Sequence, residues 1–382
     1  MDFQLTEEQE MIRKMSREFS DEVIAPRAKE MEETGEPPYD IISKMAELGL
    51  MGIPFPEEYG GSGGDWVSQL LCTEEISRGD VTLGTLLDVT TGIVCQELYV
   101  FGTEEQKRQW MVPLAQGKEI GAFGLTEPNA GSDAGATQTT AVLEGDTWVV
   151  NGTKQFISNM GYKNSSLVII TARCPQFKRE DGKGVINTFV VPKGTSGFTI
   201  GMHWDKMGLS SYPTNELVFQ DCRIPRDYLL GRDGRGFAQH LQVLETGRIF
   251  IGAIAVGLAQ ACFDASLAYA KQRYQFGQPI YSFQAVSFKL ADMAMNIALA
   301  RLMYLKAAWI KDEGLPHSLE ASYAKLFSSE MAERAASDAV QIHGGYGYMT
   351  DYAVSRYYKA AKLLQIIEGT SEIQRYVISH NL

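Results

Sequence analysis

The last third of the chain constrains its fold most, because a helical period of apolar residues holds there almost to the end. Four long runs follow one another, separated by short loops that contain glycine and proline: residues 237–272, 283–311, 319–342 and 352–364. Long helices joined by short loops pack side by side and antiparallel. This segment therefore predicts a four-helix bundle.

The first 120 residues are also helical in pattern, but the period changes near Gly121. Beyond that point the chain carries short β-prone runs bounded by turn residues, namely 148–150, 156–157, 167–171, 188–191 and 216–219. Because no helical run separates them, they predict a small antiparallel β-barrel or sandwich. We therefore expect a mainly α protein with a β middle domain: an N-terminal helical domain (1–120), a β domain (121–232) and a C-terminal four-helix bundle domain (233–382).

The charge of the chain excludes two classes of binding protein. Its 35 lysines and arginines are outnumbered by 47 aspartates and glutamates, which gives a formal net charge of −12 over 382 residues. Nucleic-acid binders and polybasic membrane-surface proteins need a cationic footprint, so we expect neither. No GxGxxG motif opens a βαβ unit, which disfavours a nicotinamide cofactor on a Rossmann domain.

The cysteines and the apolar stretches favour a cytoplasmic protein. The five cysteines are scattered and form no CxxC pair, so the sequence predicts neither a metal site nor a disulfide framework. The most apolar stretch, residues 249–259, is shorter than the ~20 residues that a membrane span needs. The acidic start does not resemble a signal peptide. We therefore expect no membrane span and a location in the cytoplasm.

Three segments combine residue types that could carry chemistry. The loop 123–133 is rich in small residues and hydroxyls, which suits a phosphate or a polar ring edge, although a plain turn is the simpler reading. The corner 273–279 reads locally as a helix C-cap at Gly277. In the segment 365–375, Glu368 follows apolar residues. It is either a poised base or a helix-capping carboxylate.

Taken together, these segments support a more specific interpretation. Five motifs, in this order and spacing, resemble those of the acyl-CoA dehydrogenase family over essentially the whole chain: Pro56–Gly61, Thr126–Asp133, Arg273–Gly277, Gln341–Gly347 and Glu368–Ser371. The family fold has a helical N-terminal domain, a β middle domain and a helical bundle, which agrees with the expectation above. The resemblance implies non-covalent FAD, an acyl-CoA substrate, an electron-transfer flavoprotein as partner and a homo-oligomer, most often a tetramer.

The resemblance also implies which residues hold the cofactor. Phe156, Ile157 and Ser158 stand where many members carry Trp-Ile-Thr against the flavin ring, and Arg273 belongs to a group that reaches FAD across a subunit interface. His343 departs from the apolar residue that is commoner at its position, and we interpret it as a residue for packing or for hydrogen bonding within the loop, not for catalysis. The implied FAD contacts are Phe123, Leu125, Thr126, Gly131, Ser132, Phe156, Ile157, Ser158, Arg273, Gln275, Phe276, Gln284, Gln341, Gly344, Gly345, Thr370 and Glu372.

Glu368 matches the family's catalytic base. The resemblance implies that it removes the α-proton of the thioester while a hydride leaves the β-carbon for flavin N5. The N–H of Glu368 and a flavin ribityl hydroxyl would hold the thioester oxygen. Some members carry the base instead at the position of Gly247, where a glycine cannot serve. We therefore expect Glu368 to be the base.

The acyl group is the less constrained part of the substrate. Glutaryl-CoA members use an arginine where this chain has Gly84, which disfavours a dicarboxylyl group. Asp88 lies on a helix whose counterpart walls the acyl pocket, and it either faces that pocket or is a solvated helix residue or cap. A pocket-facing Asp88 would favour a short, branched, cyclic or hydroxylated acyl group. The implied substrate contacts are Ser132, Asp88, Glu245, Arg248 and Gly369.

Two other functions fit the same motifs. One is an enoyl-CoA reductase, because the chemistry is reversible and the sequence does not fix its direction. The other is a flavin-binding scaffold without turnover, and the presence of Glu368 argues against it.

Overall fold

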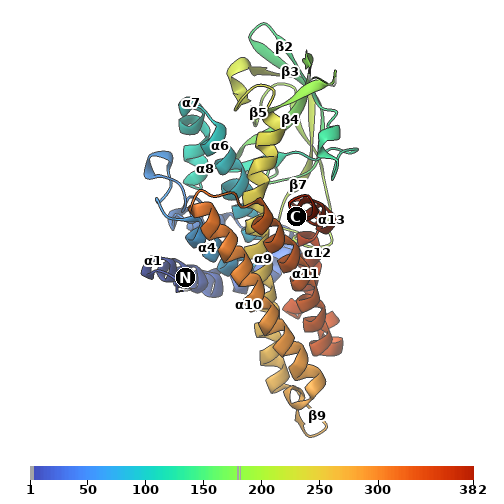
Figure 1. Cartoon of the computed structure of the whole chain (residues 1–382). Coiled ribbons are helices and arrows are strands. Elements are labelled where there is room, and N and C mark those ends of the chain that lie inside the picture. Colours follow the sequence, from blue (N-terminus) through green and yellow to red (C-terminus); the bar gives the residue numbers. More distant parts are fainter. Residues whose placement is uncertain (1–3, 179, 181) are drawn as a thin grey trace.

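The computed structural model describes residues 4–178, 180 and 182–382. Strands from the middle of the chain form a layer at one end of the molecule, and long helices run away from it (Figure 1). The helices of the first part are short, which lets the chain turn often around a shared core. They are α1 (Glu7–Phe19), α2 (Ala28–Thr34), α3 (Tyr39–Glu47), α4 (Trp66–Gly79), α5 (Val81–Leu87), α6 (Gln96–Phe101), α7 (Glu104–Gln106) and α8 (Val112–Ala115).

The strands form one eight-stranded sheet in the order β6-β7-β3-β2-β4-β5-β8, with β1 beside β4. The five predicted β-prone runs all fall within β3, β4, β5 and β7, so the β middle domain is confirmed. The strands are β1 (Ile120–Gly124), β2 (Thr140–Glu144), β3 (Thr147–Ser158), β4 (Ser165–Lys178), β5 (Gly184–Pro192), β6 (Phe198–His203), β7 (Thr214–Pro225) and β8 (Leu229–Leu230).

The sheet differs from the predicted antiparallel arrangement in one respect. β1 pairs with β4 in parallel, with Gly121 opposite Leu167, and β2 meets β4 in parallel at Thr140 and Arg173. Strands joined by a hairpin must be antiparallel, whereas β1 reaches β4 only after β2 and β3, and so long a connection permits a parallel pair. β1 contains two glycines among five residues, which hid it from a search for β-branched runs.

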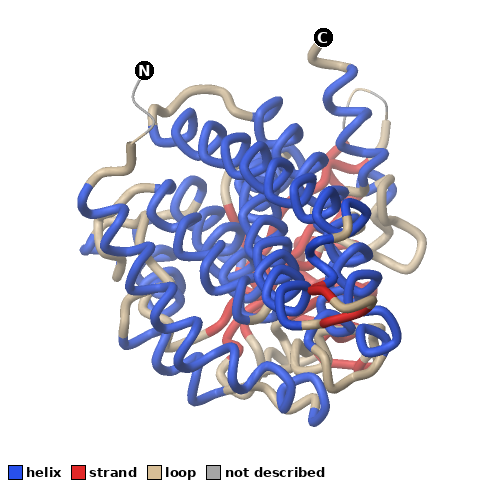
Figure 2. The backbone as a smooth tube through the Cα atoms, turned by 90° about the horizontal axis from the view of Figure 1, so that it is seen from below, coloured by secondary structure: helices blue, strands red, loops and turns tan. Residues whose placement is uncertain are grey.

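The C-terminal bundle matches the four predicted runs to within one residue at every end, and it is confirmed. α9 packs against α10, α11 and α4, so it ties the bundle to the N-terminal helices. Figure 2, seen from below, shows helices in front of most of the strands. The elements are α9 (Gly236–Gln272), β9 (Tyr274–Gln275), β10 (Gln278–Pro279), α10 (Gln284–Asp312), α11 (Ser318–His343), α12 (Ala353–Leu364) and α13 (Ser371–Ser379).

α9 is the central helix of the core. By length and composition it could cross a membrane, which the shorter apolar stretch 249–259 alone had not indicated. However, 78% of its most apolar window is buried inside the protein, and Ile251, Ile254 and Leu258 belong to the largest apolar cluster. This burial is typical of the core helix of a helical protein.

Candidate functional site

Glu368 lies in the turn between α12 and α13, with its backbone in a left-handed conformation. Its φ is 56° and that of Gly369 is 87°, a conformation that side chains other than glycine rarely adopt. Three hydrogen bonds from two side chains hold the turn. Gln374 Nε2 donates to the carbonyls of Glu368 (3.0 Å) and Gly369 (2.9 Å), and Lys325 Nζ donates to the carbonyl of Gly369 at 2.7 Å. Such strain persists only where the surroundings over-determine it, and it clusters at functional sites.

The turn itself also decides between the two local interpretations of Glu368. Thr370 is the residue that caps α13, because its Oγ1 accepts the N–H of Ile373 at 3.3 Å. Glu368 is therefore free of a capping role. Its carboxylate instead points at α9.

α9 leaves room for the carboxylate at Gly247. A Cβ atom on Gly247 would lie 2.4 Å from Oε2 of Glu368, so a larger residue there would displace the carboxylate. Arg248 follows on the same helix and is buried, and its Nη1 lies 3.4 Å from Ser322 Oγ. Among the described residues, neither Glu368 Oε2 nor Arg248 Nε has a hydrogen-bond partner. Unsatisfied buried groups of this kind indicate a place for a ligand.

Burial and two cations set the proton affinity of Glu368. Burial raises the pKa of its carboxyl to about 7, against the opposing charges of Arg248 and Lys325. Burial also lowers the pKa of Lys325 to about 8. A carboxyl whose pKa lies near neutral pH can accept a proton and release it again, which is what a general base needs.

Asp88 is buried beside this corner, so the interpretation as a solvated helix residue is wrong. Its exposed fraction is 1%, and it opens a π-helical segment, Asp88–Cys95, that continues α5. Burial raises the pKa of its carboxyl well above the ordinary value, and the charge of Glu368 raises it further. The two carboxyls therefore act on each other.

The first loop predicted to hold the cofactor follows β1 and is anchored at its start. The ring of Phe123 stacks on that of His240 on α9, with centroids 3.8 Å apart and planes 8° apart. Beyond it the Leu125 carbonyl accepts a hydrogen bond of 3.2 Å from Lys154 Nζ. Gly131 and Ser132 are exposed, and a Cβ on Gly131 would meet nothing within 4 Å, so the loop is open to a ligand.

A buried ion pair, which the sequence analysis did not find, braces this loop. Lys154 Nζ lies 2.7 Å from Glu127 Oε1 with both side chains inaccessible, and Glu127 also accepts the N–H groups of Gln138 (2.6 Å) and Thr139 (3.1 Å). Burial alone would raise the pKa of Glu127, but Lys154 and the hydrogen bonds lower it to about 2. A lysine between two β-prone runs, 27 residues beyond an acidic motif residue, was the only signal in the sequence.

The end of β3 presents a ring to the surface near the first loop. Phe156 has a φ of 60° and is 56% exposed, and its ring contacts that of Trp204 at 5.3 Å. Ile157 beside it is buried, and Ser158 Oγ lies 3.3 Å from Thr214 Oγ1. An exposed aromatic ring on a strained backbone is typical of a surface that a planar ligand covers.

A second group of predicted residues lies at the far end of α9, next to β9 (Figure 1). Arg273, Gln275, Gly344 and Gly345 line a groove of about 490 Å³. The Arg273 guanidinium lies 5.6 Å from the ring centroid of Tyr346. Other predicted residues in this region are exposed: Phe276, Gln284 and Gln341.

His343 packs as expected. Its Nδ1 donates to the Ala339 carbonyl at 2.8 Å, and its ring stacks on Tyr269 at 4.2 Å. It therefore shapes the wall of this groove by packing, and the prediction for it is confirmed.

The two groups of residues are too far apart to hold one small molecule within one chain. Gly247 and Arg273 lie on or at the end of the same continuous helix, so at 1.5 Å per residue they are separated by about 39 Å. The other predicted residues of the Glu368 corner are Glu245 on α9, Gly369 and Thr370 in the turn, and Glu372 on α13. The predicted residues thus form two separate groups, called half-sites below, one beside Gly247 and the other at the C-terminal end of α9.

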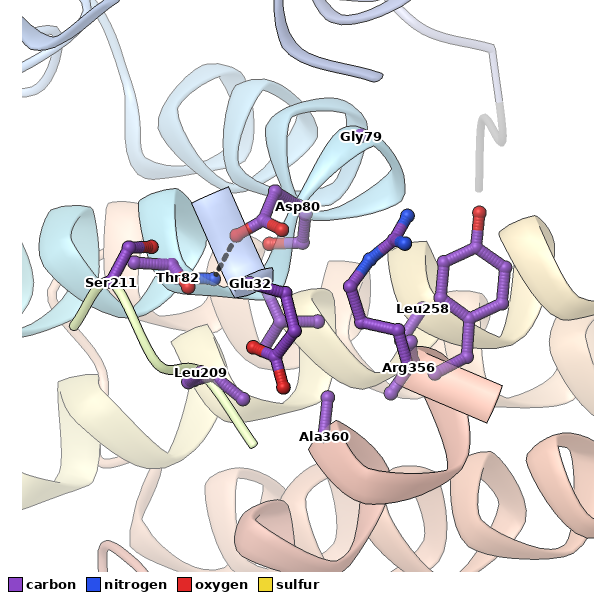
Figure 3. Close-up of a pocket in the computed structure, with 12 residues that line it drawn as sticks. Glu32, Gly79, Asp80, Thr82, Leu209, Ser211, Leu258, Arg356 and Ala360 are labelled. Carbon is purple, nitrogen blue, oxygen red and sulfur yellow. Dashed lines mark hydrogen bonds between the residues drawn. The ribbon is translucent and has the colours of Figure 1, made fainter. Parts of the chain in front are cut away.

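Figure 3 shows a small cavity whose lining includes none of the predicted site residues. It is lined by residues of several elements, among them Glu32, Asp80 and Arg356. Its volume of about 20 Å³ is room for roughly one water molecule. Asp80 accepts the N–H of Thr82 at 2.8 Å and so caps α5, which gives this cavity a structural role.

Models of one protein family match nearly the whole chain. The N-terminal, middle and C-terminal domains of acyl-CoA dehydrogenase match residues 6–118, 122–222 and 234–382. These three matches occur in the order of the three structural parts described above.

Individual relatives agree with the family models. The probable acyl-CoA dehydrogenase YngJ of Bacillus subtilis (strain 168) is 54% identical over 100% of both chains. Butyryl-CoA dehydrogenase from Megasphaera elsdenii is 42% identical with a TM-score of 0.95, covering 100% of this chain and 99% of that one. A chain from a structure of the electron transferring flavoprotein of Acidaminococcus fermentans is 44% identical, with a TM-score of 0.96 and the same coverage. The chain therefore belongs to the acyl-CoA dehydrogenase family, whose members are FAD-dependent oxidoreductases.

Proposed function

We propose that the protein oxidises a short-chain acyl-CoA at its α and β carbons, with Glu368 as the base. The observation that carries this proposal is the Glu368 carboxylate: unpaired at Oε2, held in a strained turn and flanked by Arg248 and Lys325. A thioester α-proton is weakly acidic, so its removal needs a positioned base of this kind.

The free backbone donor of Glu368 supports the same role. Its N–H makes no backbone hydrogen bond in the described part of the chain. A donor held beside the base can polarise the thioester oxygen where negative charge develops, as in an oxyanion hole. One residue would thereby supply both the proton acceptor and one oxygen ligand.

The residues present fit FAD in the two half-sites. The exposed Phe156 ring and the open loop at Gly131 and Ser132 offer a surface for a flavin, while the groove at Arg273 suits a charged, elongated group. FAD, when bound, supplies the acceptor for the hydride that leaves the β-carbon. The chain's part is to orient the acyl group and to remove the proton.

A short acyl group is favoured by the chain's own residues and by its relatives. Gly84 has no space for an arginine, since even a Cβ there would lie 1.9 Å from Ser77 Oγ, which argues against a dicarboxylyl substrate. Glu245 and Arg248 would border the bound acyl-CoA. The butyryl-CoA dehydrogenase named above acts on a four-carbon acyl group, and we propose short-chain acyl-CoAs as the substrate class of this chain as well.

The distance between the two half-sites along α9 favours a homo-oligomer in which two subunits complete each FAD site. α10 supports this idea with a row of exposed apolar residues at helical spacing on one face: Phe288, Met295, Leu299, Leu302 and Trp309. A stripe of this size on a monomer is typical of an interface. We propose a tetramer in the cytoplasm that passes electrons to an electron-transfer flavoprotein, the kind of protein in the Acidaminococcus fermentans structure.

Bleaching of the flavin tests the proposed function directly. The purified yellow protein is mixed anaerobically with butanoyl-CoA and longer acyl-CoAs, and the flavin absorbance is followed. We expect rapid bleaching by the short-chain substrate, and return of the colour when an electron-transfer flavoprotein is added. A protein that keeps its colour with every acyl-CoA would instead be a flavin-binding scaffold.

Arg273→Ala should weaken FAD retention and the oligomer together. The guanidinium lines the groove at the far end of α9, where it would bind part of a cofactor held mainly by another subunit. Gel filtration with detection of protein and flavin measures both properties in one run. Lys271→Ala, which removes a neighbouring exposed cation outside the groove, is the matched control. A monomer that retains its full flavin would contradict the shared site.

Lys325→Met should shift the pH dependence of flavin reduction to higher pH. Glu368 must be ionised to accept a proton, so the rate should rise with pH through about 7, the pKa of its carboxyl. Lys325 and Arg248 lower that pKa, and Asp88 is a second carboxyl that interacts electrostatically with Glu368. Loss of the Lys325 charge should therefore raise it.

Stopped-flow flavin reduction between about pH 6 and 9 measures the midpoint of the rate profile. A shift of about one pKa unit in Glu368 would fall within this range. Lys306→Met removes an exposed lysine that pairs with Glu320 at 3.5 Å on the surface, and its midpoint should equal that of the parent. Equal midpoints for all three proteins would show that Lys325 only supports the turn.

A further inference from the structure

The proposed reaction gives no role to the Asp88 carboxyl. Its side chain is buried, and its Oδ1 has no hydrogen-bond partner among the described residues. Asp80, at the start of α5, shows the ordinary arrangement, because its Oδ1 accepts the N–H of Thr82. A buried polar group without a partner destabilises a fold, so its presence indicates a use that the protein alone does not show.

The neighbours of Asp88 place it in the same space as Glu368. Both carboxyls act electrostatically on the Tyr212 hydroxyl, which donates to the Thr85 carbonyl at 3.2 Å and interacts with the hydroxyl of Ser158. Ser158 ends β3, next to the exposed Phe156. Asp88, Glu368 and the end of β3 therefore all lie close to the Tyr212 hydroxyl, where the acyl group would lie between base and flavin.

The local helix geometry also affects the direction of the Asp88 side chain. The helix changes from α to π at this residue and remains so to Cys95. The wider π turn redirects the side chains at its start, and such segments occur frequently at functional sites.

The charges around the two carboxyls divide their roles. Arg248 and Lys325 both act on Glu368, whereas in the described part of the chain the only charge recorded as acting on Asp88 is that of Glu368 itself. The negative charge is therefore most stable on Glu368, which leaves Asp88 as a carboxylic acid with one donor and one acceptor.

We propose that Asp88 faces the part of the acyl group beyond the β-carbon, and that the substrate exchanges a hydrogen bond or a proton with this carboxyl there. The inference rests on the proposed function and narrows its substrate class. The class comprises short acyl groups with a distal hydroxyl and unsaturated cyclic ones. A plain alkyl chain would leave Asp88 as unsatisfied as it is without substrate.

The two members of this class would use Asp88 differently. A hydroxyl would exchange hydrogen bonds with the carboxylic acid. An unsaturated ring without an α-hydrogen offers no proton to Glu368, so Glu368 takes the proton of Asp88, and the proton of a distal C–H bond then passes to the Asp88 carboxylate. The electron pair of that bond forms a new carbon–carbon double bond, and a hydride from a second carbon passes to FAD.

The experiment compares the ranking of three probes in the FAD-loaded parent, Asp88→Asn and Asp88→Leu. The probes are butanoyl-CoA, 4-hydroxybutanoyl-CoA and cyclohex-1-enecarbonyl-CoA, each read as the rate of flavin reduction. Asp88→Leu should lower the rate with the hydroxylated or cyclic probe, relative to butanoyl-CoA, by roughly tenfold or more, the worth of one buried hydrogen bond. Asp88→Asn should retain the hydroxylated probe, because its amide still donates and accepts, but lose the cyclic one, because it takes no proton.

Stability and a control variant separate this role from a structural one. Asp88→Leu should melt at the same temperature as the parent or higher, with unchanged FAD content, because it removes an unsatisfied buried group. Asp80→Asn, on the same helix segment, should leave the ranking of the probes unchanged. If both Asp88 variants keep the parent's ranking and rates, the inference is wrong and the proposed function stands. If butanoyl-CoA and the other probes all fail to bleach the parent, the proposed function itself fails.

Discussion

Glu368→Gln should slow flavin reduction by acyl-CoA by roughly 10²–10⁴-fold, the usual contribution of a positioned general base. The amide has the shape of the carboxyl but cannot accept the α-proton. The substitution leaves the backbone of the turn unchanged. The N–H of residue 368 therefore remains, and so do the hydrogen bonds that Gln374 and Lys325 donate to the backbone carbonyls of the turn. Fold, FAD content and acyl-CoA binding should therefore be close to those of the parent, and the loss should appear in single-turnover stopped-flow traces.

Glu313→Gln is the matched control, because it changes an exposed glutamate at the end of α10 and should react at the parent's rate. Near-normal flavin reduction by Glu368→Gln would show that another group takes the proton. Asp88 would be the first candidate, and Glu368→Gln combined with Asp88→Asn would test it. An inactive variant that has also lost FAD would be discounted, and the chemical step would be measured after reconstitution with FAD.

The sequence predicts the helical parts of this fold better than its sheet. A helical period extends over tens of residues, so each helix of the bundle could be placed to within one residue. β1 carries no such signal, since it is rich in glycine, and the alternation of apolar and polar residues in β6 extends over only six residues, one of them glycine. The parallel pairing of β1 with β4 depends on how distant segments meet, which local patterns do not contain.

The same limit applies to the candidate site. Glu368 was predicted from a motif, and Gly247 and Arg248 from the positions that the family resemblance implies, and the structure brings these three together. Lys325 stands in no motif, and only the packing of α11 against the turn brings its Nζ to the Gly369 carbonyl. The burial of Asp88 was undecidable for a related reason, because hydroxyl and apolar residues around it fit both a core and a surface helix.

Lys154→Met should be the most destabilising of the substitutions considered. It leaves the Glu127 carboxylate buried without its cation, and breaking a buried pair in this way costs about 3–5 kcal/mol of the free energy of unfolding. Nζ also donates to the Leu125 carbonyl, so the loop between β1 and Ser132 should loosen and FAD should be retained less well. Thermal melting and the ratio of flavin to protein measure the two effects.

The pH dependence of stability distinguishes the loss of the ion pair from a general disturbance of packing. In the parent, the pKa of Glu127 is lowered to about 2, so its stabilising contribution is complete above its ordinary value and disappears only as the pH falls toward 2. Without Lys154, burial is less opposed and the pKa of Glu127 should rise above the ordinary value. Protonation of Glu127 then removes the unpaired buried charge from the variant. The difference in the free energy of unfolding between parent and variant should therefore shrink as the pH falls from 7 toward 5.

Lys154→Met combined with Glu127→Gln removes both charges and should recover part of the lost stability at pH 7. A deficit that is equal at both pH values, and unchanged in the double variant, would show that the methionine disturbs packing rather than an ion pair.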